Sequence, residues 1–348
     1  MKNVFLIYLV LASFVLISCE KKVAEYSGED ISTEASIIRN KHTKQAILKI
    51  NTSEPWVLYA GKSAETIDLS SPIMRGKEGG MFNLNVPNSI RMYFQLEMNR
   101  GTAILAERQL PMEGGYNFRD LGGIKNKEGR YTKWGKIFRS DDLYHLTDSD
   151  LKYLSSIPLV SIVDFRSAEE IQNAPDRNPA SLKENYPYSI NPGSLMSLSL
   201  SASNEKITPA QVDSMMMLLN RLLVIDPEII GKYRDFFGLL QNENNIPLLF
   251  HCSAGKDRTG MAAALVLFAL GVDEEVIFND YLQSNQYLSG KYADMIAQNP
   301  ETKSLFEVKP EFLQAGLAEI KKVYGSVEVY LTDILHVDLT KMKNMYLY

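Results

Sequence analysis

The feature that most restricts how this chain can fold is a polar loop of eight residues between two strongly apolar segments. Residues 246–250, Ile-Pro-Leu-Leu-Phe, are typical of a short buried strand, and residues 259–270 are typical of a buried helix that ends at Gly271. The loop between them, residues 251–258, reads His-Cys-Ser-Ala-Gly-Lys-Asp-Arg. A loop that leaves a strand and enters a helix directs backbone N–H groups and the positive end of the helix dipole toward one point. The sequence therefore predicts an anion-binding loop.

Two residues of this loop have the chemistry of phosphate-ester cleavage. Cys252 lies at the start of the loop, where the same field favours the thiolate and lowers the pKa of the cysteine. Arg258 lies at the start of the helix, where its planar guanidinium can bind two equatorial oxygens of a phosphoryl group. We therefore predict Cys252 as the nucleophile and Arg258 as the phosphate clamp. The predicted substrate-binding residues around them are His251, Ser253, Ala254, Gly255, Lys256 and Thr259.

The loop matches the signature His-Cys-x5-Arg-Ser/Thr-Gly of the protein tyrosine phosphatase superfamily. Average residue usage makes a chance match on the order of 10⁻⁸ per position. Further motifs, in order, resemble exported bacterial phosphatases that act on phosphotyrosine and, in several cases, on phosphoinositides. They are Asn-Phe-Arg-Asp-Leu-Gly-Gly at 117–123, Phe-Arg-Ser at 138–140, Asp-Phe-Arg-Ser at 164–167, Tyr-Leu-Gln-Ser-Asn at 281–285 and Tyr-Gly-Ser at 324–326. The resemblance implies hydrolysis of phosphate monoesters through a cysteinyl-phosphate intermediate, with no metal or organic cofactor.

Three residues in the loop or directly after it have individual roles in this prediction. Gly255 lets the backbone turn tightly around the phosphate, and the Thr259 hydroxyl can donate to the cysteine sulfur. Lys256 resembles the extra cation of lipid phosphatases that helps hold a second phosphate, or it only attracts phosphate monoesters in general. The expected substrates are therefore phosphotyrosine proteins, phosphoinositides, or both. The alternative function is a catalytically weak surface lipoprotein that binds phosphoesters or a protein partner.

The general acid is harder to assign, because several carboxyl groups could protonate the leaving oxygen. We predict Asp257, which lies in the loop that faces the substrate. Asp164 and Asp120 are secondary candidates. The alternative for both is a structural role, in which they pair with Arg166 or Arg139.

Residues 1–19 have the pattern of an export signal, with a cationic start, an apolar stretch and Ser-Cys at the end. Cys19 resembles the lipid-modified cysteine of a bacterial lipobox. A plain transmembrane anchor is the alternative, although the apolar run at 4–17 is shorter than the roughly 20 residues that a spanning helix needs. We therefore expect an exported protein, anchored by lipid to a bacterial membrane on its periplasmic side or at the cell surface.

The remaining chain divides into three predicted segments. Residues 20–36 are polar and are interpreted as a tether, and residues 37–110 show the period-2 alternation of a small β-sandwich-like module. Residues 111–348 alternate strands and helices, which favours a phosphatase-like α/β domain with a mixed or parallel sheet flanked by helices. An amphipathic helix capped by Thr208 could be an active-site lid or an ordinary core helix.

Composition excludes some classes of site. The formal net charge of −5 gives no basic field for nucleic acid. The four histidines are scattered without paired metal-ligand spacing, so we predict no metal site. If Cys19 carries lipid, Cys252 is the only thiol and no internal disulfide can form.

Overall fold

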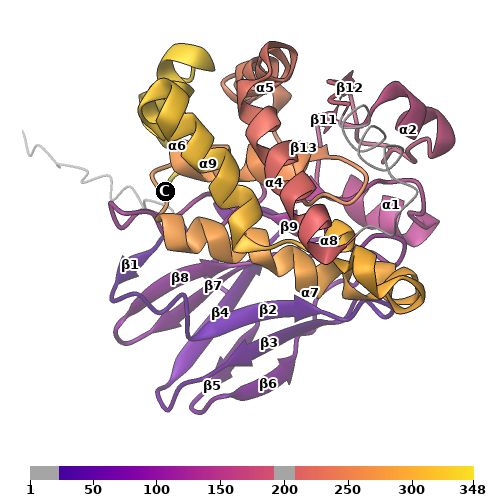
Figure 1. Cartoon of the computed structure of the whole chain (residues 1–348). Helices are drawn as coiled ribbons and strands as arrows, with labels where there is room; N and C mark the ends of the chain where they lie inside the picture. The colour runs from indigo at the N-terminus through magenta and orange to yellow at the C-terminus, as the bar shows by residue number, and fades with distance from the viewer. Residues whose placement is uncertain (1–22, 192–207) are drawn as a thin grey trace, which may run out of the picture.

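The computed structural model of the protein describes residues 23–191 and 208–348. The predicted signal peptide and its Cys19 lie outside the described residues. Within them, a strand-rich N-terminal region precedes an α/β region in which helices pack on a central sheet (Figure 1). The predicted fold class, a mixed sheet flanked by helices and preceded by a small all-β unit, is confirmed. In these ranges, no helix combines the length and the apolar character that a membrane crossing requires.

The N-terminal region consists of two antiparallel sheets around a common apolar core. One sheet has the order β1-β8-β7-β4-β5 and the other β2-β3-β6. In β3, Ala46, Leu48 and Ile50 point inward, where they meet Trp56 and Leu58 of the first sheet. This alternation of buried and exposed positions is the pattern expected for packed sheets. The strands are β1 (Ser27–Gly28), β2 (Ala35–Arg39), β3 (Ala46–Ile50), β4 (Trp56–Gly61), β5 (Met74–Gly76), β6 (Gly80–Asn83), β7 (Tyr93–Met98) and β8 (Gly101–Leu105), with one 3-10 turn at Ala64–Thr66.

Part of the segment interpreted as a tether belongs to this folded region. Ser27–Gly28 pairs with β8, Ile31 is fully buried, and β2 already begins at Ala35. The mostly polar composition of residues 20–36 suggested an open chain, but backbone pairing at a sheet edge does not require apolar side chains. The folded part therefore starts before residue 37.

The α/β region has a five-stranded sheet of order β12-β11-β13-β10-β9. Its strands are β9 (Arg119–Asp120), β10 (Ile137–Ser140), β11 (Ser161–Asp164), β12 (Glu184–Pro187) and β13 (Leu248–His251). All neighbours are parallel except β9, which pairs antiparallel with β10. Because β10, β11 and β13 are parallel, their carboxyl ends meet at one edge of the sheet, where ligands of such sheets commonly bind.

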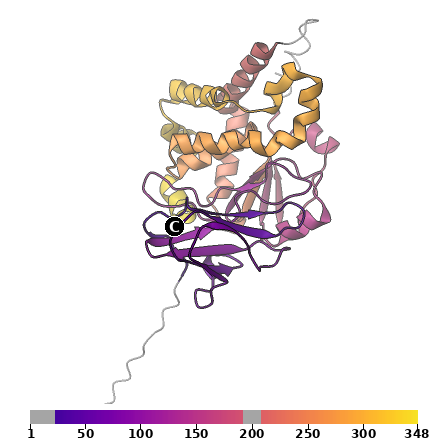
Figure 2. The same cartoon turned by 90° about the horizontal axis from the view of Figure 1, so that it is seen from below.

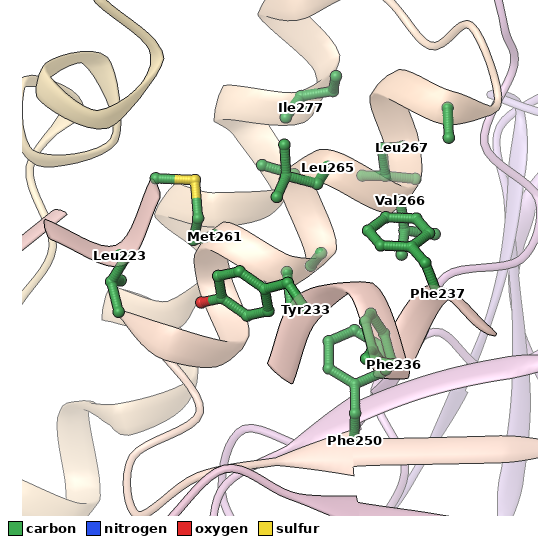
Figure 3. Packing of buried hydrophobic residues seen from close by; sticks show 14 of the residues in the cluster. Leu223, Tyr233, Phe236, Phe237, Phe250, Met261, Leu265, Val266, Leu267 and Ile277 are labelled. Carbon is green, nitrogen blue, oxygen red and sulfur yellow. The ribbon is translucent and has the colours of Figure 1, made fainter. Parts of the chain in front are cut away.

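Helices pack on both faces of this sheet, most of them on the face that carries Val163 and Phe250. They are α1 (Asp148–Ser155), α2 (Ala168–Asn173), α4 (Pro209–Ile225), α5 (Pro227–Leu240), α6 (Arg258–Ala269), α7 (Glu274–Gln298), α8 (Lys303–Phe306), α9 (Pro310–Tyr324), α10 (Val327–Val329) and α11 (Leu339–Tyr346), with short 3-10 turns at Glu243–Asn245 and Pro300–Thr302 and a π-helical turn at Tyr330–Ile334. In the centre, every residue of α6 except Phe268 is buried. Phe250 of β13 contacts Phe236 of α5, and the α6 side chains Met261 and Leu265 lie in the same core (Figure 3). This packing fixes the start of α6 against the end of β13.

Helix α4 belongs to this core along one face. Thr208 accepts a hydrogen bond from the Gln211 N–H, which is the predicted N-cap. Val212, Met216 and Leu223 are buried in the same cluster as α6. Of the two interpretations of this amphipathic helix, the structure favours the ordinary core helix.

The opposite face of the sheet is covered by α1 and by the N-terminal region. Phe138 of β10 packs in a second apolar cluster with Tyr153 of α1. From the N-terminal region, the Arg91 guanidinium lies 5.2 Å from the ring centroid of Phe138, and Arg39 lies 5.4 Å from that of Tyr153. The strands of the N-terminal region therefore lie directly against the α/β region, as Figure 2 also shows from below.

Buried ion pairs connect the two regions. Arg91 pairs with Asp120 at 2.9 Å, and both side chains are fully buried. Lys44 pairs with Asp150 of α1 at 2.9 Å. Buried charges are tolerated only when they are paired, so these contacts fix the two regions in a defined arrangement.

Candidate active site

The predicted loop connects the end of β13 to the start of α6. Cys252 is the first residue after the strand and is 2% exposed. Gly255 has a φ of +66°, and a Cβ placed on it would lie 2.2 Å from the carbonyl oxygen of Ser140 in β10. Only glycine fits this position, because both the backbone conformation and the close approach of β10 exclude a side chain. The tight turn predicted at Gly255 is therefore present.

The carbonyl groups of the loop accept hydrogen bonds on the side that faces away from the expected anion. Asn117 Nδ2 donates to the carbonyl oxygens of Ala254 and Gly255, each at 3.0 Å. Arg139 donates to the Gly255 carbonyl at 2.6 Å. Because the C=O and N–H of one trans peptide unit point in opposite directions, bonds that hold these carbonyl groups on one side direct the N–H groups of the same peptide units toward the concave side of the loop.

A lysine of α7 holds the first part of the loop. Lys291 Nζ lies 3.2 Å from the carbonyl oxygen of Ser253. Its charge is compensated by Asp141 at 2.7 Å and Asp142 at 2.9 Å. We call Asn117, Arg139 and Lys291 the back wall of the loop. Together they hold three successive carbonyl groups away from the position of an anion.

The environment of Cys252 favours the thiolate. Burial of the sulfur acts most strongly and raises the pKa. The positive charge of Arg258, together with the nearby hydroxyl and N–H of Thr259, acts in the opposite direction, and the pKa of Cys252 is lowered below its ordinary value. The nearby Asp257 carboxylate opposes this lowering. The buried Thr259 hydroxyl has no hydrogen-bond partner among the described residues and so remains available for the predicted contact with the sulfur.

The guanidinium of Arg258 is fixed on one side by a carboxylate. Its Nη1 lies 2.7 Å from Oε2 of Glu170 and its Nη2 lies 2.8 Å from Oε1. Nη1 also donates to the carbonyl oxygens of Phe165 and Ile190. Among the described residues, the Nε–H and the second N–H of Nη2 have no such partner. These two donors lie on one edge of the guanidinium and can bind two oxygens of one phosphoryl group.

Glu170, the partner of Arg258, belongs to the first turn of α2. It forms a capping box with Ser167, and its Oε1 accepts a hydrogen bond of 2.5 Å from the Ser253 hydroxyl. Burial raises the pKa of Glu170, but the donors from Arg258, Ser253 and Ser167 outweigh burial and bring it to about 2. Glu170 therefore stays ionised near neutral pH and orients Arg258, but it cannot donate a proton.

Asp257 is placed in the loop beside its neighbour Lys256. The Lys256 ammonium lies 2.8 Å from Oδ2 of Asp257 and also contacts the Glu307 carbonyl oxygen. Oδ1 of Asp257 is buried and has no hydrogen-bond partner among the described residues. Asp257 therefore keeps one carboxyl oxygen available for a ligand in the loop.

The two secondary acid candidates have structural contacts. Asp164 forms a bidentate ion pair with Arg166, as the alternative interpretation expects. Asp120 is fully buried and accepts from the backbone N–H groups of Gly122 and Gly135, in addition to its ion pair with Arg91. The expected pairing of Asp120 with Arg139 is therefore not the one observed. Asp120 pairs instead with Arg91 of the N-terminal region, a contact that the order of the motifs does not reveal.

Comparison with known proteins agrees with this arrangement. A family model described as "Tyrosine phosphatase family" matches residues 110–348, which is more than half of the chain. The chain belongs to the tyrosine phosphatase family. The strand-rich region before residue 110 lies outside the match, whereas the loop and its back wall lie inside it.

Relatives of this tyrosine phosphatase family member carry phosphatase names. A protein of Cupriavidus necator, named as a tyrosine-protein phosphatase, is 34% identical over 247 residues, which cover 66% of this chain and 85% of that protein. The triple specificity protein phosphatase PtpB of Mycobacterium tuberculosis is 27% identical over 276 residues, covering 66% of this chain and 94% of PtpB. The core catalytic domain of a PP-IP phosphatase from S. cerevisiae is 15% identical with a TM-score of 0.28, and covers 54% of this chain and 96% of that domain. The family match and the C. necator relative show that the chain is a phosphoric monoester hydrolase of the tyrosine phosphatase type.

Behind Cys252, this phosphatase contains a compact group of four charged side chains. His251 Nε2 lies 3.1 Å from Asp176, and Arg166 contacts both Asp176, at 2.7 Å, and Asp164, at 2.8 Å. Burial disfavours a charged imidazole, but the two carboxylates outweigh it and raise the pKa of His251 to about 9. We call His251, Arg166, Asp164 and Asp176 the buried quartet, whose two positive and two negative charges balance.

The buried quartet also bears on metal binding. Ligand atoms of Asp164, Asp176 and His251 lie within 4.8 Å of one another, a spacing that could suit a metal ion. The guanidinium of Arg166, however, already lies within ion-pair distance of both carboxylates. A cation of the protein therefore takes the place that a metal ion would need.

Proposed function

We propose that this chain hydrolyses phosphate monoesters through a cysteinyl-phosphate intermediate, with Cys252 as the nucleophile and Asp257 as the general acid. The observation that carries the proposal is the loop itself. The loop begins with Cys252, whose pKa is lowered, and the back wall directs the N–H groups of the loop inward. Arg258 completes it with two donors on one edge of its guanidinium, held by Glu170.

In the first step, the Cys252 thiolate attacks phosphorus in line with the ester oxygen. The S–P bond forms while the P–O bond to the leaving group breaks. The loop N–H groups and Arg258 stabilise the charge on the three equatorial oxygens. Asp257, in its protonated form, gives its proton to the leaving oxygen.

In the second step, water attacks the phosphorus of the intermediate. The Asp257 carboxylate accepts a proton from this water, and the S–P bond breaks. The sulfur leaves as a thiolate, to which the Thr259 hydroxyl, without another hydrogen-bond partner in the described part of the chain, can donate. Inorganic phosphate is released and the enzyme returns to its starting state.

Phosphotyrosine proteins and phosphoinositides are the proposed substrates. The name of the M. tuberculosis relative, a triple specificity protein phosphatase, supports a loop that accepts more than one kind of phosphate ester. Lys256 adds a buried cation to the loop, although Asp257 and the Glu307 carbonyl oxygen already contact it. Because these two contacts already hold the Lys256 ammonium, they support a general attraction of phosphate esters more than a dedicated site for a second phosphate group.

The proposed location is outside the cytoplasm, with a lipid on Cys19. The support is the leader of residues 1–19 with its small residue before the cysteine. Metabolic labelling of the full chain in a bacterial host with an alkynyl fatty acid should give a labelled membrane protein, and Cys19→Ala should lose the label. Equal labelling of both proteins would exclude this site of attachment.

The activity is tested by phosphate release from p-nitrophenyl phosphate, a phosphotyrosine peptide and a phosphoinositide, with EDTA present throughout. Residues 20–348 should turn over at least one of them, and Cys252→Ser should abolish turnover while the protein still binds tungstate. Asp257→Asn should slow an alkyl phosphate about 10²–10⁴-fold but p-nitrophenyl phosphate much less, because nitrophenolate leaves without a proton.

Two results would contradict parts of the proposal. Equal loss of both substrates in Asp257→Asn would remove Asp257 from the role of general acid. A folded wild type that binds tungstate but hydrolyses nothing would support the alternative, a lipoprotein that only binds phosphoesters.

A further inference from the structure

A group of buried charges lies behind the loop and is not used in the mechanism above. Asp280 of α7 is 4% exposed. Its carboxylate accepts from Arg119 at 3.0 Å and from Arg139 at 2.9 Å. A single carboxylate thus compensates two arginines from the strands β9 and β10, on the side of the loop that faces away from an anion.

Both arginines are connected to the loop by hydrogen bonds. Arg139 uses one nitrogen for Asp280 and the other for the Gly255 carbonyl oxygen, at 2.6 Å. Arg119 donates to the side-chain oxygen of Asn117, whose amide nitrogen in turn donates to Ala254 and Gly255. Asp280 is therefore the common acceptor of the two chains of hydrogen bonds that hold the middle of the loop.

The charges of this group and of the nucleophile also interact. Burial, and next the neighbouring Arg119, lower the pKa of Arg139 to about 9, whereas Asp280 and the Cys252 thiolate raise it. The interaction is mutual, so the Arg139 cation also favours the thiolate. If Asp280 lost its charge, two buried arginines would remain without a counter-ion, and Arg139 would tend to lose its proton or move toward water.

We propose that Asp280 is a positioning residue for the phosphatase reaction, which orients the loop through Arg139 and through Arg119 with Asn117. It does not touch the substrate. Its carboxylate keeps Arg139 charged and in contact with the Gly255 carbonyl, so that the loop N–H groups face the phosphoryl group and Cys252 stays a thiolate. This inference rests on the proposed function, but the loop geometry that it concerns can be measured without turnover.

The test compares Asp280→Asn with the wild type by two readouts that need no catalysis. The affinity for tungstate, measured by calorimetry, should fall about 10-fold or more, and the pH at which iodoacetamide alkylates Cys252 should shift upward. Turnover of p-nitrophenyl phosphate should fall about 100-fold, as expected for a misplaced site. The matched control is Asp273→Asn, which changes an exposed carboxylate at the start of the same helix. It should leave all three readouts unchanged.

A second variant keeps the test decisive if Asp280→Asn does not fold. Arg139→Lys retains a positive charge but has no planar fork to bridge Asp280 and the Gly255 carbonyl. It should lose tungstate affinity while the alkylation profile of Cys252 changes little. A folded Asp280→Asn or Arg139→Lys with wild-type tungstate affinity, whatever its melting temperature, would overturn the inference. If the wild type binds tungstate but has no turnover, the proposed function fails, and the tungstate and alkylation readouts still decide the role of Asp280.

Discussion

At the scale of single residues, His251 owes its positive charge to its surroundings. It carries the second positive charge of the buried quartet, and its pKa of about 9 lies above the ordinary value of 6.5. A raised pKa stabilises the folded protein fully below the unfolded value, and this stabilisation disappears as the pH rises through the folded value. The phosphatase should therefore lose on the order of 3 kcal/mol of unfolding free energy between about pH 6.5 and 9.5 from this group.

Urea unfolding of wild type and His251→Asn across this pH range measures that loss. The depressed pKa of Cys252 contributes to both proteins, so the difference between their slopes reports on His251. The wild type should lose stability more steeply than the variant. Parallel curves would mean that His251 is neutral in the folded protein.

The sequence was sufficient to find the residues of the loop but not those that hold it. Cys252, Arg258 and Thr259 lie within one short stretch, where residue type and spacing define the geometry. Glu170 lies 88 positions from Arg258, and Asn117 lies 137 positions from Ala254. Such long-range contacts depend on how the strands are ordered in the sheet. Ser167 with Glu170 did offer a signal, since Ser-x-x-Glu is a capping box, but that motif does not indicate a phosphate clamp.

At the scale of elements, the turn between β13 and α6 depends on one glycine. Gly255→Ala places a methyl group at a positive φ and against the carbonyl oxygen of Ser140. Moving either backbone would displace the loop from its back wall, so phosphatase activity should fall by about 100-fold or more. Phosphate release and tungstate affinity measure the effect.

Gly129→Ala is a matched control for this substitution. Gly129 also has a positive φ, of +81°, but a Cβ there meets no atom within 4 Å. Its cost should be limited to backbone strain of about 1 kcal/mol, with unchanged activity. If Gly255→Ala behaves like Gly129→Ala, the close approach of β10 to the loop is not required for function.

The strands and helices themselves were predictable where their patterns are strong. The strand before the loop was expected at 246–250 and is found at Leu248–His251. The buried segment 157–164 forms a strand only from Ser161, because its first residues follow α1 as a connection. Alternation and capping residues define the presence of an element, whereas its ends depend on the neighbours with which it pairs.

At the scale of the whole molecule, the N-terminal region packs beside α1 on one face of the catalytic sheet. Arg91→Met would leave Asp120 buried without its counter-ion, and breaking such a pair costs about 3–5 kcal/mol. We expect a large fall in the midpoint of urea unfolding, with loss of both regions in one transition. Lys322→Met, which removes an exposed partner of Glu319, should change stability by less than about 0.5 kcal/mol.

The double variant Arg91→Met/Asp120→Asn separates charge from packing. It should recover part of the stability lost in Arg91→Met, because no unpaired charge remains. Two separate transitions in the wild type would instead indicate that the N-terminal region folds independently. In that case, the contacts of Arg91 and Lys44 would contribute little to the stability of the catalytic region.

The back wall also determines which esters this enzyme can admit. In the proposed mechanism, a phosphoryl group seated in the loop would present three bare oxygens to the N–H groups and Arg258, and only its fourth oxygen would face the opening. A monoester satisfies this arrangement with its single substituent directed outward. A diester carries two substituents, so one of them would have to occupy the space of the protein backbone. Selection of monoesters over diesters would therefore follow from the shape of a loop that its back wall holds in place. It requires no separate group to recognise or reject the alcohol.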